Sequence, residues 1–70
     1  MRRKVFEKKF RDLQARRGYG RNAFVLVSGA GFMIYVNDYE INKSDTRYIH
    51  LLFNQNFIGE VALSAIKEVD

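Results

Sequence analysis

Hydrophobic positions recur with a helical period at the start of the chain and with a strand period after it. Phe6, Phe10 and Leu13 are spaced i, i+4 and i+7, so a helix would carry them in one stripe. We predict a helix over residues 3–17, ended by Gly18 as a left-handed C-cap. The helix is short and its stripe is narrow, so it needs a surface on which to dock.

From Ala23 onward the apolar positions alternate with a period of two, and the residue types are those common in strands. The alternation predicts four strands, at residues 24–27, 32–36, 47–53 and 57–63. Turn-forming residues separate them at 28–31, 42–45 and 54–56, with a bulge or turn at Asn37-Asp38. We expect Ser64 to cap a last short turn that places Ile66 and Val69 against the core.

Every connection between the predicted strands is of hairpin length, so an antiparallel meander is the simplest topology. We therefore predict a single α+β domain over residues 1–70, in which a basic helical arm (1–21) packs on a four-stranded antiparallel sheet (22–70). A small β-barrel of the Sm or SH3 kind, with the N-terminal helix at its mouth, is the alternative. The helix stripe would pack against one face of the sheet: Phe32, Ile34, Val36, Ile49, Leu51, Phe53, Val61 and Leu63.

The opposite face of the predicted sheet is less polar than a solvated face usually is. Its residues are Met33, Tyr35, Tyr48, His50, Leu52 and Glu60. Seventy residues without a disulfide form a marginal core, so we expect this face to be an interface, most simply in a homodimer, or to be buried inside a sheet that closes on itself. A second interpretation is a platform on which Tyr35, Tyr48 and His50 stack single-stranded bases.

Charge is divided unevenly along the chain. The first 21 residues have a net charge of +7 and the remaining 49 a net charge of −3, which together give the +4 of the whole chain. A positive field concentrated at one end favours phosphate, an acidic protein or an anionic membrane as partner. We predict that an anionic partner contacts these side chains: Lys4, Lys8, Lys9, Arg11, Arg16 and Arg21.

The sequence argues against catalysis and against a bound metal or cofactor. It has no cysteine and one histidine, which excludes a Zn site of the usual Cys/His kind. The spacing of Asp38, Glu40 and Asp45 matches no Ca²⁺ loop, and the glycines do not open a helix after a strand as a phosphate cradle requires. We expect a protein that is not an enzyme.

Three classes of function fit this description. The first is binding of RNA, DNA or a nucleoprotein through the basic helix. The second is protein interaction through the sheet face or the helix, as in the compact phage and mobile-element proteins that inhibit or modulate a larger host protein. The third and weakest is association with an anionic membrane surface, without stable insertion. The missing cysteines and the absence of a stretch long enough to span a bilayer favour a cytoplasmic protein.

Overall fold

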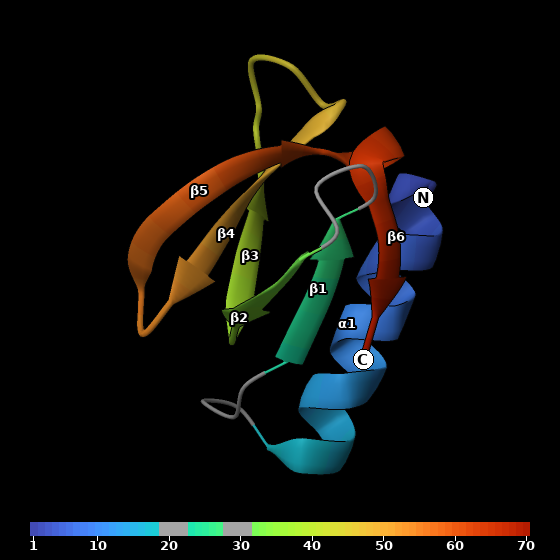
Figure 1. Ribbon diagram of the computed structural model, residues 1–70, viewed down its shortest axis with the longest axis vertical. Coiled ribbons are helices and arrows are strands. Elements are labelled where there is room, and N and C mark those ends of the chain that lie inside the picture. Colours follow the sequence, from blue (N-terminus) through green and yellow to red (C-terminus); the bar gives the residue numbers. More distant parts are fainter. Residues whose placement is uncertain (19–22, 28–31) are drawn as a thin grey trace.

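The computed structural model describes residues 1–18, 23–27 and 32–70. It contains one α-helix, six strands and a short 3₁₀-helix in these residues (Figure 1). In chain order they are α1 (Arg3–Arg17), β1 (Ala23–Val27), β2 (Phe32–Val36), β3 (Asp38–Ile41), β4 (Tyr48–Phe53), β5 (Asn56–Ala62), η1 (Leu63–Ala65) and β6 (Ile66–Val69).

The helix α1 has the bounds that the sequence predicts. Its last turn is closed by the Gly18 N–H, which donates to the Gln14 carbonyl at 2.8 Å. Gly18 has φ +88° and ψ 151°, so its φ is positive as expected of a glycine C-cap, but its ψ is extended rather than helical. Only glycine adopts this conformation without strain, which explains why the helix ends here.

The strands form two three-stranded antiparallel sheets, one in the order β2-β1-β6 and one in the order β3-β4-β5. The structure thus confirms the α+β class with an N-terminal helix and antiparallel strands, and it adds two strands that the sequence pattern did not reveal. These are β3, which follows the Asn37 bend, and β6, which was expected to be a turn. Because β6 returns to pair with β1, the ends of the chain's β region meet in one sheet.

Asn37 is the single residue between β2 and β3, and the chain passes through it from one sheet to the other. Its backbone N–H donates to the Leu52 carbonyl at 3.1 Å, and its carbonyl accepts from Gln14 Nε2 at 3.2 Å. Its side chain exchanges two hydrogen bonds with Asn54, each of 2.9 Å. Asn37 is buried, and these four hydrogen bonds satisfy its backbone and side-chain polar groups at the corner where the chain passes between the sheets.

The hairpin of β4 and β5 turns through Asn54 and Gln55, which have φ +51° and +69°. A two-residue hairpin loop with both φ values positive matches the right-handed twist of the strands. Past the turn, Leu51 pairs with Gly59 and Leu52 with Phe57, so Ile58 is an extra residue that bulges from β5. The bulge accounts for the strong curvature of β5 in Figure 1.

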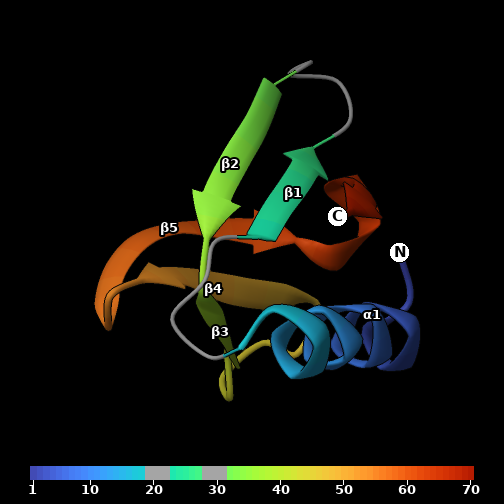
Figure 2. The same cartoon turned by 90° about the horizontal axis from the view of Figure 1, so that it is seen from below.

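The core joins the helix stripe to residues of both sheets. Nine buried residues form one cluster: Phe6, Phe10, Leu13, Val36, Ile49, Leu51, Leu63, Ile66 and Val69. Ile34 and Val61 are partly buried and pack against this cluster, and the structure does not describe the side chain of Phe32. Figure 2 shows α1 on one side of the molecule, with strands β1 and β2 extending away from it on the other.

Two smaller predictions can be compared with the structure. Asn42 forms the expected turn, since its Oδ1 accepts from the N–H groups of Ser44 and Asp45 at 2.9 and 3.2 Å. Ser64 lies inside η1, and Ala62 occupies the N-cap position without a side-chain hydrogen bond, so the predicted cap is wrong. The connection predicted at Ser28–Gly31 lies outside the described residues.

Candidate nucleic-acid interface

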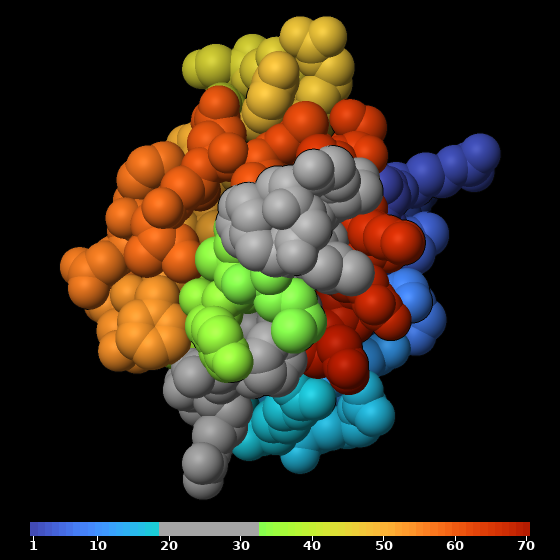
Figure 3. Space-filling model, viewed as in Figure 1, coloured from blue at the N-terminus to red at the C-terminus, as the bar shows by residue number. Residues whose placement is uncertain are grey.

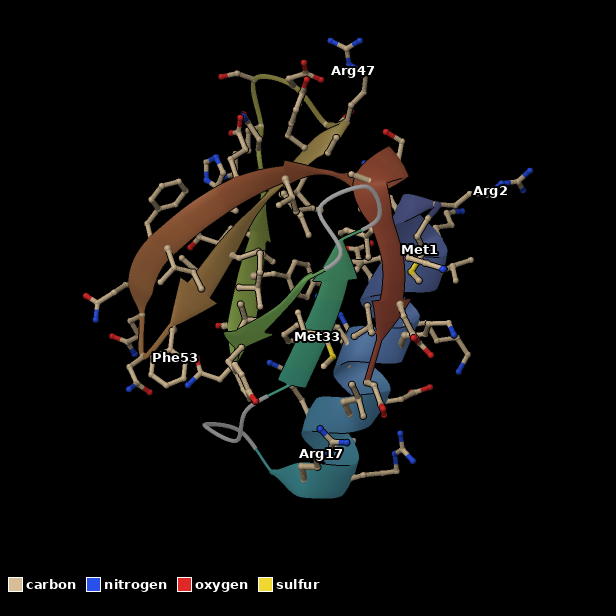
Figure 4. The ribbon with its side chains drawn as sticks, in the orientation of Figure 1. Met1, Arg2, Arg17, Met33, Arg47 and Phe53 are labelled. Carbon is tan, nitrogen blue, oxygen red and sulfur yellow. The ribbon has the colours of Figure 1, made fainter. Side chains whose placement is uncertain are left out.

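Helix α1 separates its side chains by character. Phe6, Phe10 and Leu13 are buried against the sheets, whereas every lysine and arginine of the helix is exposed. Five of the six residues predicted to bind an anion are described, and all five are exposed: Lys4, Lys8, Lys9, Arg11 and Arg16. Arg21 lies outside the described residues. Arg2 and Arg17 extend the exposed basic surface to both ends of the helix (Figure 4).

Few of these cations have an acidic partner. Lys8 Nζ is 3.0 Å from Asp12 Oδ2, and Arg17 Nη2 is 3.7 Å from Asp70 Oδ1. In the part of the chain that the structure describes, no ion pair involves the other lysines and arginines of α1. Glu7, which sequence spacing would pair with Arg3 or Arg11, instead accepts a hydrogen bond from the Tyr39 hydroxyl at 3.3 Å. The helix therefore presents an excess of positive charge to solvent.

Tyr39 of β3 fixes the helix to the sheet, a role that the sequence pattern did not indicate. Its ring centroid lies 5.0 Å from that of Phe6 and 5.0 Å from that of Phe10, in edge-to-face contacts. Arg11 Cζ lies 6.0 Å from the same ring. Burial, and secondly the Glu7 carboxylate, raise the pKa of Tyr39, so its hydroxyl stays protonated and donates at neutral pH.

The predicted interface residues of the sheets are not equally accessible. Met33 and Tyr35 of β2 are 57% and 55% exposed, whereas Tyr48 and His50 are half-buried and Leu52 is buried. Tyr35 belongs to one sheet, and Tyr48 and His50 belong to the other. Sequence reasoning missed Phe57 and Ile58 of β5, which are 60% and 45% exposed.

His50 belongs to a polar cluster on the β3-β4-β5 sheet. Glu60 Oε2 lies 2.8 Å from His50 Nε2 and accepts from Asn42 Nδ2 at 2.8 Å. The His50 ring also meets Phe57 edge-on, with 5.1 Å between centroids. Among the described residues, no group of three histidine, cysteine or acidic side chains is arranged to hold a metal ion.

The loop after β3 holds a tight ion pair that faces solvent. Arg47 donates to Asp45 through Nε at 2.9 Å and through Nη2 at 2.7 Å. These hydrogen bonds lower the pKa of Asp45 to about 2. Arg47 itself points away from the body of the molecule, at the end remote from Arg17 (Figure 4). Its charge is neutralised locally, unlike most charges of α1.

No helix in the described ranges has both the length and the apolar character to cross a bilayer. Comparison of the chain with protein-family models, with curated proteins and with solved structures finds no match.

Proposed function

We propose that this protein is a non-enzymatic nucleic-acid-binding module that contacts phosphates through the exposed basic side chains of α1. The observation that carries the proposal is the excess of unpaired cations on a helix whose other side is committed to the core. Lysines and arginines on one rigid face can follow a phosphate backbone. When they neutralise phosphates, counterions are released from the nucleic acid, and this release supplies most of the non-specific affinity. A nucleoprotein would offer the same phosphates.

A charge-reversal pair tests this proposal. Lys4→Glu with Lys9→Glu reverses two exposed cations of α1, and glutamate has nearly the same helix propensity as lysine. The control, Arg47→Glu with Lys67→Glu, makes the same change in net charge at exposed positions outside the helix. We expect the helix pair to weaken binding of a labelled 12-nucleotide uridine strand by at least about tenfold at ~0.1 M salt, and the control pair much less. Equal effects of both pairs would contradict a site on α1.

We also propose that the protein self-associates, with a homodimer as the expected state. What supports this is the open outer side of two of the four edge strands, since neither β5 nor β6 has a hydrogen-bonded strand on its outer side within the described ranges. In the space-filling view, β5 (orange) and α1 (blue) lie at opposite margins, with β6 (red) next to the helix (Figure 3). Exposed strand edges pair readily with other chains, and exposed Phe57 and Ile58 add apolar surface to that of β5.

Sedimentation at tens of micromolar decides the oligomeric state, and a monomer throughout that range contradicts self-association. A monomer that also fails to bind nucleic acid would favour the alternative function. In that case the exposed Met33 and Tyr35 would contact a foreign protein, whose activity the chain would inhibit or modulate.

A further inference from the structure

A groove of about 770 Å³ lies between α1 and the edge strand β3. The helix contributes Glu7, Arg11 and Gln14, β3 and the loop after it contribute Asp38 to Lys43, and β4 contributes His50. Its volume is within the roughly 300–1,000 Å³ of small-molecule sites, so it is large enough for a nucleobase. Arg11 belongs both to this groove and to the basic side of α1, so the two surfaces are contiguous.

Charge differs between the groove and the helix surface beside it. The groove carries the carboxylates of Glu7, Asp38 and Glu40, against the cations Arg11 and Lys43. The neighbouring helix surface carries Lys4 and Lys8 with the single nearby acid Asp12. A phosphate is attracted to the helix surface and repelled by the carboxylates, whereas a neutral base can enter the groove. Such a charge pattern would orient a single strand with its backbone along α1 and a base turned toward β3.

Glu7 is the carboxylate best placed to read that base. It is half-buried, and the Tyr39 hydroxyl donates to its Oε1 at 3.3 Å. Packing of the Tyr39 ring against Phe6 and Phe10 fixes the position of its hydroxyl. The hydroxyl in turn holds the Glu7 carboxylate at the wall of the groove. The Arg11 guanidinium, one helical turn further on, offers a planar cation on which a base can stack.

A carboxylate discriminates among bases by the donors they present. The Watson–Crick edge of guanine carries two adjacent donors, the ring N1–H and the exocyclic amino group, which match the two oxygens of a carboxylate. Adenine, cytosine and uracil each place an acceptor beside their donor on that edge. We infer that the groove binds a guanine base of a single-stranded nucleic acid whose phosphates lie on α1. This inference rests on the proposed function and adds its base preference.

The experiment compares fluorescence anisotropy of labelled 12-nucleotide RNAs: all uridine, uridine with one central guanosine, and uridine with one central inosine. We expect the guanosine strand to bind about tenfold more tightly than the uridine strand, as for one bidentate base contact. Inosine keeps the N1–H but lacks the amino group, so it should lose most of the gain. Thymidine DNA with one deoxyguanosine should give the same ratio, because the contact is to the base edge.

Glu7→Gln is the decisive variant, and exposed Glu68→Gln on β6 is its control. Both remove one negative charge, so both shift the affinity for every strand through the net charge. Only Glu7→Gln is expected to bring the ratio of guanosine to uridine affinity down to about one. Tyr39→Phe keeps the ring contacts with Phe6 and Phe10 but loses the bond to Glu7, and it should reduce the ratio partly. Circular dichroism checks that each variant is folded, and Tyr39→Phe provides the test if Glu7→Gln is not.

Two results overturn the inference. A wild-type ratio near one, with uridine strands still bound, rejects the guanine site and leaves the proposed function standing. A guanosine preference that survives in folded Glu7→Gln and Tyr39→Phe also rejects it. Failure of the wild type to bind any of these strands rejects the proposed function and the inference together.

Discussion

The helix and the β3-β4-β5 sheet differ in whether their charged side chains have partners of opposite charge. In the sheet and its loop, Asp45 pairs with Arg47, and Glu60 accepts from both His50 and Asn42. In α1, most cations face solvent without an acid beside them in the described part of the chain. Paired charges keep their field local, whereas unpaired charges of one sign sum over a surface. These paired charges of the sheet therefore satisfy one another, and the helix has charge left for a partner.

Detaching the helix from the sheet should have the largest effect on stability. Phe10 is fully buried and its ring lies 5.7 Å from Phe6 and 5.0 Å from Tyr39. We expect Phe10→Ala to lower the free energy of unfolding by about 3–5 kcal/mol, which is most of the stability of a chain this small. Exposed Val5→Ala, in the same helix, should stay within about 0.5 kcal/mol. Urea unfolding measures both, and similar losses in the two variants would contradict the docking of α1 described above.

The Asn37 corner should be the most sensitive point of the sheets. Asn37→Ala removes the two side-chain bonds to Asn54 and leaves the Asn54 N–H without that partner. We expect a loss of about 1–3 kcal/mol, the usual cost of an unmade buried hydrogen bond. Asn56→Ala, at an exposed position of the same hairpin, serves as control. A loss of less than about 0.5 kcal/mol at Asn37 would show that water replaces the lost bonds.

The β4–β5 turn offers a change of opposite sign. Gln55 has φ +69°, a conformation that costs a residue with a Cβ about 1 kcal/mol. We expect Gln55→Gly to raise the free energy of unfolding by about 0.5–1 kcal/mol, because Asn-Gly is the preferred pair in this turn. Gln55→Ala keeps the strain and should not stabilise. A midpoint of urea unfolding that falls in the glycine variant would contradict the assigned turn.

The smallest effect should be local to the Asp45–Arg47 pair. In Arg47→Ala, the pKa of Asp45 should rise from about 2 toward its ordinary 3.8, because the side-chain hydrogen bonds from Arg47 are the main cause of the lowered pKa. Because the pKa of Asp45 is lower in the folded protein than in the unfolded chain, ionised Asp45 stabilises the fold at pH values above the unfolded pKa. That contribution disappears as the pH falls through about 2. The pair lies at the surface, so the melting temperature at pH 7 should hardly change. An NMR titration of the Asp45 carboxyl carbon that still gives a pKa near 2 would contradict this cause.

Periodicity in the sequence predicts the helix, most of the core and the four longer strands, because these features depend on neighbours within a few residues. It does not reveal β3 and β6, which have only four residues each, too few to show a period. The return of β6 to β1, where Val69 pairs with Val25, joins segments far apart in the chain. Tyr39 was missed for the same reason, since its importance comes from meeting Phe6, Phe10 and Glu7 across the fold.

The basic residues of the candidate site were predicted directly, because charge and helical phase can both be read from the sequence. Their exposure and the scarcity of acids beside them required the structure. The groove beside them was not predicted, since it is formed by β3, a strand that the pattern did not indicate.

The dependence of nucleic-acid binding on salt tests the central claim most directly. If all six predicted cations contact phosphates of the uridine 12-mer, a plot of log affinity against log salt should have a slope of about −4. Lys4→Gln with Lys9→Gln should flatten the slope by about 1.4, and exposed Arg47→Gln with Lys67→Gln should leave it unchanged. A slope near zero, or the same flattening in both pairs, would contradict a phosphate-binding surface on α1.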